Sequence, residues 1–65
     1  MNMCEANAYL IEGEEKTLVM EAVDIIEPDG EGIRLESIFG DQKFLNARIR
    51  SLALNDHQIF LERQT

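Results

Sequence analysis

Apolar and polar residues alternate with a period of two along most of this 65-residue chain. In the first such run, one face carries Cys4, Ala6, Ala8 and Leu10, and the other carries Glu5, Asn7, Tyr9 and Ile11. Alternation of this kind predicts a β-strand with one face turned inward. The inward residues are small at the start of the run, which leaves room for another backbone or a partner chain to approach Cys4. Residues 13–15 then break the run and predict a turn.

Residues 16–27 fit two interpretations. Their apolar positions match a helical stripe, but they also match two short strands at 17–20 and 23–26. The segment is rich in β-branched residues, which favour strands, and no good N-cap precedes it as a helix would require. We therefore interpret it as two strands, with the helix as the alternative.

The strongest turn signal lies at 27–32, where Pro28 is expected at the second turn position and Gly30 and Gly32 accept positive φ. Residues 33–39 alternate again and predict the second arm of a hairpin closed by that turn. Further strands are predicted at 42–45, 47–54 and 58–62, with turns at 40–41 and 55–56. Residues 63–65 are expected to form a frayed end.

Six or seven short strands without a convincing long helix predict an all-β fold, a small antiparallel barrel or sandwich. The length predicts a single domain over residues 1–65. One cysteine excludes an intramolecular disulfide, and such small domains are often stabilised by association, so we expect a homodimer. The chain has neither an apolar run of the roughly 18–20 residues that span a membrane nor a signal-peptide pattern, so we expect a cytoplasmic protein.

The charge balance argues against nucleic acid as a partner. Six Lys and Arg residues oppose thirteen Asp and Glu residues, which gives a formal net charge of −7. Nucleic-acid binding depends on cations that displace phosphate counterions, and long-range electrostatics should repel DNA and RNA here. If an RNA-binding surface did exist, its candidate contacts would be Arg34, Arg48 and Arg50.

Catalytic chemistry has little support in the sequence. The only histidine, His57, lies in a predicted turn, where a solvated side chain is the expected state. Pairing it with Cys4 as a nucleophile would require long-range folding and a third, orienting group. The carboxylates are spread along the chain without calcium-loop spacing. We therefore predict a protein that is not an enzyme.

Cys4 is the one residue with distinctive chemistry, because it lies close to the amino terminus. A thiolate, its own deprotonated amide nitrogen and a nearby terminal amine form a strong-field chelate. Nitrogen and sulfur ligands in one plane suit Ni(II) or Cu(II), whereas Zn(II) prefers a tetrahedral site. Two chains with adjacent amino termini would complete a four-coordinate site on a two-fold axis. The alternative is a structural cysteine in a plain protein-interaction domain.

Three segments together suggest a family. The chain opens with MCEA at 3–6, carries IRLESIFG at 33–40 and closes with IFLE at 59–62. This pattern resembles the CooT family of small nickel-binding proteins over essentially the whole chain. The resemblance implies a compact SH3-like β-barrel and a homodimer, in which the cysteine after the initiator methionine supplies nickel ligands from both chains. Some members are linked to nickel delivery for carbon monoxide dehydrogenase, and related sequences have been labelled predicted RNA-binding proteins.

Only Cys4 carries over to the family's functional position. In this chain Met1 and Asn2 precede Met3, so the cysteine is fourth and not second. A start at Met3 would restore the terminal amine as a ligand, whereas a start at Met1 would leave backbone amides as the nitrogen donors. We therefore predict a small all-β homodimer that binds Ni(II) through Cys4 and its symmetry mate. A nickel enzyme is the expected client, and an RNA-binding or protein-interaction module is the alternative.

Overall fold

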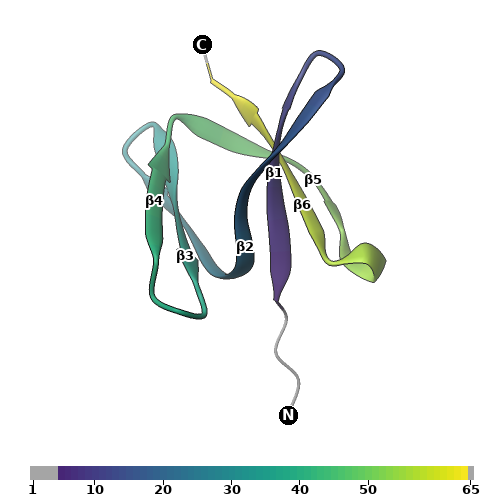
Figure 1. Cartoon of the computed structure of the whole chain (residues 1–65). Helices are drawn as coiled ribbons and strands as arrows, with labels where there is room; N and C mark the ends of the chain where they lie inside the picture. Colours follow the sequence, from purple (N-terminus) through teal and green to yellow (C-terminus); the bar gives the residue numbers. More distant parts are fainter. Residues whose placement is uncertain (1–4, 65) are drawn as a thin grey trace.

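The computed structural model describes residues 5–64, so Cys4 and the question of the start residue lie outside the described part of the chain. Figure 1 shows strands joined by turns, and the described residues contain one short 3-10 helix. The elements are β1 (Ala6–Glu12), β2 (Glu15–Asp29), β3 (Gly32–Ser37), β4 (Gln42–Leu45), β5 (Ala47–Ala53), η1 (Leu54–Asp56) and β6 (Gln58–Arg63). The predicted all-β fold is confirmed. Among the described residues the structure has no helix long and apolar enough to cross a membrane.

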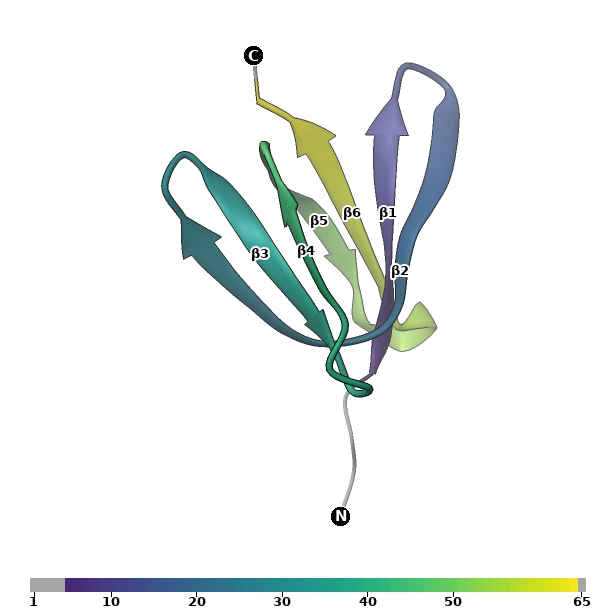
Figure 2. The ribbon, with the colours of Figure 1, turned by 60° about the vertical axis from the view of Figure 1, so that its left-hand side comes forward.

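The six strands form one sheet in the order β4-β3-β2-β1-β6-β5. This sheet curls into a half-barrel (Figures 1 and 2). Four of its five pairings are antiparallel, but β1 and β6 are parallel, so the expectation of an antiparallel barrel is wrong at this pair. The two strands are parallel because both start at the same end of the sheet, where the Asn7 N–H donates to the His57 carbonyl at 2.9 Å.

β2 is one 15-residue strand and not the two short strands predicted for residues 16–27. Its first part pairs with β1 and its second part with β3, and Val23 takes part in both ladders. The change of partner occurs at a sharp bend, where Ala22 has φ 55° and the register shifts on both sides of Val23. The strand interpretation is thus confirmed over the helical one, but the expected break between the strands is a bend within a single strand.

The turn after β2 is shorter than predicted. Pro28 is not in the turn but within β2, opposite Ile33, and the turn itself is at Gly30 and Glu31. β1 pairs with β2 only as far as Val23, so in the described chain that side of Pro28 faces no strand. A residue without an N–H is tolerated at such an edge.

The chain end also departs from the prediction. Arg63 belongs to β6, and the Gln64 N–H donates to the Asn46 carbonyl at 3.0 Å. The Gln64 side chain also donates to the carbonyls of Ala47 and Glu31. These bonds hold residues 63 and 64 against the β4–β5 connection, so the predicted fraying is wrong for both.

The core lies on the concave face of the curled sheet. Its buried apolar residues come from all strands except β4: Ala8, Leu10, Met20, Val23, Leu35, Ala47, Ile59 and Leu61. Ala8 and Leu10 are buried as the alternation of the first run predicts, and Ala6 is half-buried beside them. Several large apolar side chains remain exposed outside this core, among them Leu18, Phe39, Leu52 and Leu54.

Candidate functional site: the rim where β1 begins

The end of the molecule where β1 begins brings together four separate segments. They are the start of β1, the bend of β2, the turn between β3 and β4, and the corner between η1 and β6, all at the lower end of Figure 2. They surround a depression of about 400 Å³, here called the N-terminal rim, lined by Glu5, Asn7, Glu21, Ala22, Phe39, Asp56 and His57. The first of these residues directly follows Cys4 in the sequence.

Hydrogen bonds centred on Asn7 fix the shape of the rim. Its backbone N–H donates to the His57 carbonyl, and its side-chain Oδ1 accepts from the Ala22 N–H at 3.2 Å. The Ala22 carbonyl in turn accepts from the Ile38 N–H at 2.9 Å. Asn7 therefore ties β1 to the β6 corner and to the bend of β2, and Ala22 extends the connection to the β3–β4 turn.

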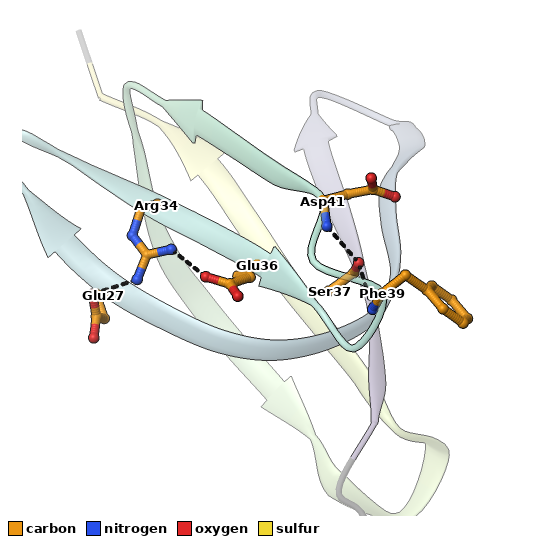
Figure 3. A network of polar contacts seen from close by, with 6 residues as sticks. All are labelled: Glu27, Arg34, Glu36, Ser37, Phe39 and Asp41. Atoms are coloured by element: carbon orange, nitrogen blue, oxygen red, sulfur yellow. Dashed lines mark hydrogen bonds and ion pairs between the residues drawn. The ribbon is translucent and has the colours of Figure 1, made fainter.

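Ser37 organises the turn on the other side of the rim. Its side chain is buried, with 4% exposed, and its Oγ accepts from the N–H groups of Phe39 and Asp41 at 3.1 and 3.2 Å (Figure 3). The Ser37 N–H also donates to the Asp41 carbonyl. This turn ends β3 at Ser37, two residues before the predicted end at 39, and it holds Phe39 with 76% of its surface exposed.

The rim is acidic. Glu5, Glu21 and Asp56 contribute three carboxylates, and His57 contributes one imidazole. His57 is an exposed residue in the left-handed conformation (φ 54°) at the end of η1, which confirms its prediction as a solvated turn residue. Within residues 5–64, no three or more His, Cys, Asp or Glu side chains are grouped closely enough to hold a metal ion. A metal at this end would therefore need ligands from Cys4, from backbone nitrogens or from a second chain.

A second depression adjoins the rim and is mainly apolar. It has a volume of about 370 Å³ and is here called the β2–β5 groove. Its walls are formed by Ala6, Val23, Ile26, Leu52, Leu54 and Ile59, with Glu5, Asp24, His57 and Gln58 at its polar positions. Leu52 is 53% exposed and Leu54 is 76% exposed, so the open side of the half-barrel presents apolar surface directly beside Glu5.

Of the three arginines predicted as candidate RNA contacts, Arg48 and Arg50 lie on β5, whereas Arg34 lies on β3. Arg34 lies on β3 between two carboxylates, Glu27 at 2.6 Å and Glu36 at 2.7 Å (Figure 3). The hydrogen bond to Glu27, followed by that to Glu36, raises the pKa of Arg34 above its usual value. Arg48 pairs with Glu62 on the adjacent strand β6 at 2.6 Å. Two of the three arginines thus form ion pairs with carboxylates of the same sheet. That the protein does not bind nucleic acid stays a prediction.

The family assignment follows from the sequence of the whole domain. The sequence model of CooT, described as CO dehydrogenase accessory protein CooT, matches residues 3–62. This chain belongs to the CooT family. The resemblance seen in the sequence is therefore confirmed, and the matched region begins at Met3, so that Cys4 is the second matched residue.

Known proteins similar to this CooT-family chain support the fold as well. The crystal structure of a candidate CooT from Carboxydothermus hydrogenoformans superposes with a TM-score of 0.90 at 45% sequence identity, covering 95% of this chain and 100% of that one. An uncharacterised protein of Methanocaldococcus jannaschii is 40% identical over 60 residues, which is 92% of this chain and 98% of the relative. An uncharacterised protein of Methanothermobacter thermautotrophicus is 36% identical over 61 residues, covering 94% and 91% of the two chains.

The rim itself could not be found by sequence analysis. Asn7, Glu21 and His57 are distant in the chain, and none belongs to a motif that predicts their meeting. The only available signal was the position of Cys4 at the start of the first strand, which indicates where chemistry could occur but not what surrounds it.

Proposed function

We propose that this protein binds Ni(II) through Cys4 and the same residue of a second copy, as an accessory protein of a nickel enzyme. The observation that supports the proposal is the family match, which begins at Met3, so that Cys4 is the second residue matched. A thiolate flanked by backbone nitrogen is a donor set that suits Ni(II).

The acidic rim supports this proposal electrostatically. Glu5, Glu21 and Asp56 surround the point where the N-terminal segment joins β1, and the whole chain carries a net charge of −7. A concentration of one sign of charge raises the local concentration of oppositely charged ions. The rim thus attracts divalent cations toward Cys4 without itself forming a closed ligand set.

The β2–β5 groove supports a homodimer. A second copy seated on this groove would cover Leu52 and Leu54, and exposed apolar patches of this kind are typical of association surfaces. Because Glu5 and His57 line both the groove and the rim, we propose that the two copies associate around a two-fold axis close to the rim. A site shared across the two-fold axis requires this arrangement.

The proposed role is delivery and not catalysis. Since the family is described by its accessory role to CO dehydrogenase, we propose a nickel enzyme of that kind as the client. On this view the protein holds Ni(II) reversibly, and two thiolates from separate chains can release the ion when the dimer rearranges.

Native mass spectrometry with added Ni(II) tests the nickel site. We expect one Ni(II) ion for two chains, and thiolate-to-nickel charge-transfer absorption that is lost in Cys4→Ala. The matched control is His57→Ala, which removes the rim imidazole and should leave the absorption in place. Unchanged nickel uptake by Cys4→Ala would contradict the proposal.

A variant that begins at Met3 tests the nitrogen ligands. Removal of Met1 and Asn2 brings the terminal amine next to Cys4, so the ligand-field absorption should shift in energy while the stoichiometry stays the same. An identical spectrum would show that the terminal amine does not take part in either form.

A further inference from the structure

The first part of β2 has an open edge. β1 pairs with β2 from Glu15 to Val23, whereas β3 pairs with it only from Val23 to Asp29. In the described chain, residues 16–21 therefore have a strand on one side alone. An unpaired strand edge presents backbone N–H and C=O groups that can pair with another extended chain.

A groove of about 720 Å³ runs along this edge, here called the β2–β4 groove. β2 contributes residues 18–21 to its lining, and the β3–β4 turn and β4 contribute Ser37, Phe39, Asp41, Gln42 and Lys43. β4 is the last strand on its side of the sheet, so the groove lies between two strand edges. It is distinct from the β2–β5 groove, which opens on the other side of β2.

One contact shows that β2 can accept hydrogen bonds from within this groove. The Lys43 ammonium donates to the Val19 carbonyl at 2.9 Å, and this bond is exposed. Val19 is the extra residue of a bulge, because its neighbours Leu18 and Met20 pair with the consecutive residues Tyr9 and Ala8. A carbonyl turned out of the β1 ladder is thus held by a flexible side chain that a stronger partner can replace.

Apolar contact surface is present at the same place. Leu18 is 46% exposed and Phe39 is 76% exposed, although both line the groove. The buried Ser37 hydroxyl accepts from the Phe39 N–H, so the aromatic residue stands on a fixed turn (Figure 3). Preorganised apolar side chains bind a partner with less loss of conformational entropy than flexible ones.

The charges at the groove select the type of partner. Glu21 and Asp41 line it together with a single described cation, Lys43. The two carboxylates outnumber this cation, and the whole chain has a net charge of −7. A positively charged segment complements this surface and an acidic one is repelled.

We propose that the β2–β4 groove binds an extended, basic peptide segment of a partner protein, which adds to the open edge of β2 as a further strand. Backbone hydrogen bonds to β2 provide affinity, and apolar side chains against Leu18 and Phe39 together with cations near Glu21 and Asp41 provide specificity. The groove shares Glu21 and Phe39 with the N-terminal rim, but the proposed peptide binding does not require a bound metal ion.

Fluorescence anisotropy on the full-length protein tests the proposal with a labelled peptide of alternating lysine and valine, acetyl-KVKVKVK-amide. Two control peptides separate the contributions. Acetyl-KPKPKPK-amide keeps the charge but lacks three backbone donors, and acetyl-EVEVEVE-amide reverses the charge. We expect both controls to bind at least about tenfold more weakly than the probe.

Substitutions locate the binding surface. Phe39→Ala should weaken binding of the probe at least about fivefold, because it removes the apolar contact. Lys43→Met should strengthen binding about threefold, because it frees the Val19 carbonyl and removes a repelling charge. The matched control is Phe44→Ala, an exposed phenylalanine on β4 outside the groove (61% exposed), which should leave binding unchanged.

Three results would overturn the proposal. Equal binding of the proline peptide would show charge attraction without strand addition. Equal effects of Phe39→Ala and Phe44→Ala would place the peptide elsewhere. Conversion of a dimer to a monomer by Phe39→Ala, seen by light scattering, would show that a second copy occupies the groove.

Discussion

At the scale of single residues, the backbone conformation of Ala22 helps to determine the shape of the N-terminal rim, which this residue lines. Its φ of 55° lies in the left-handed region, which costs a residue with a Cβ roughly 1–2 kcal/mol. Hydrogen bonds from the Ala22 N–H to Asn7 and from the Ile38 N–H to the Ala22 carbonyl offset this cost. The bend of β2, and with it the N-terminal rim, depends on these contacts.

Asn7→Ala should destabilise the fold by about 1–2 kcal/mol, because a half-buried acceptor is lost and the Ala22 N–H is left without its partner. Urea unfolding followed by circular dichroism measures this change. Ala22→Gly is the matched variant, since glycine adopts the same φ freely, and it should leave stability unchanged or increase it by up to about 1 kcal/mol. Destabilisation by Ala22→Gly would contradict the account of strain.

Ser37→Ala tests the turn that holds Phe39. The hydroxyl accepts from two backbone N–H groups in a buried position, so its removal should cost about 1–3 kcal/mol in the free energy of unfolding. Ser51→Ala is the control, because Ser51 is exposed on β5, and it should change stability by less than about 0.5 kcal/mol. Equal effects of the two substitutions would show that the Ser37 hydroxyl has no special role.

Residue identities predicted burial better than they predicted backbone conformation. Ala8 and Leu10 are inside because period-two alternation assigns them to one face, and His57 is exposed because it lies in a turn. Nothing in the sequence distinguishes Ala22 from any other alanine in a strand, since the contact that accompanies its conformation is a tertiary hydrogen bond to Asn7.

At the scale of elements, the strand boundaries follow local signals wherever a turn residue is present. The strand at 42–45 matches its prediction, and the turn before it contains Gly40 in a positive-φ conformation. Pro28 was predicted in a turn but lies in a strand, because proline is common both in turns and in edge strands. Its place depends on where the pairing of β1 with β2 ends, which the sequence does not show. The parallel pairing of β1 with β6 was missed because alternation shows that a strand exists but not which strand lies beside it.

Gly32→Ala should disrupt the pairing of β3 with β4. A Cβ at this position would overlap the carbonyl oxygen of Leu45, which is backbone and cannot rotate away. We expect a loss of at least about 2 kcal/mol, together with faster amide exchange in β3 and β4.

Gly13→Ala is the control for that substitution. Unlike Gly32, Gly13 has a positive φ, and no atom of the described chain lies within 4 Å of an added Cβ there. Its cost should be about 1 kcal/mol, with no selective change of amide exchange in β4. A larger loss for Gly13→Ala than for Gly32→Ala would contradict the proposed overlap.

At the scale of the whole molecule, charge and association act against each other. Each chain has a net charge of −7, so the proposed homodimer brings two acidic bodies together. Apolar contact across the β2–β5 groove must exceed this repulsion. The sequence predicted the acidity, which opposes association, and the small size, which favours it. The surface proposed for association could not be predicted, because it depends on the fold placing Leu52 and Leu54 in a groove beside the rim.

Raising NaCl from about 10 mM to about 100 mM shortens the Debye length from about 30 Å to about 10 Å. Dimerisation measured by analytical ultracentrifugation should therefore strengthen with salt, because repulsion between the chains is screened. Leu54→Lys should weaken the dimer at both salt concentrations by placing a charge in the apolar groove. Dimerisation that weakens with salt would instead indicate an interface held by ion pairs.

The parallel pairing of β1 with β6 has a consequence for protein synthesis. β1 lies between β2 and β6, so one side of the earliest strand is completed only by residues 58–61. On the ribosome, β1 and β2 can form a hairpin early, but the ladder between β1 and β6 must wait until almost the whole domain has been translated. The hydrogen bond from the Asn7 N–H on β1 to the His57 carbonyl forms in the same step, so the rim is assembled last. A nascent chain cannot present the finished rim, and any metal loading that depends on it is confined to fully synthesised protein.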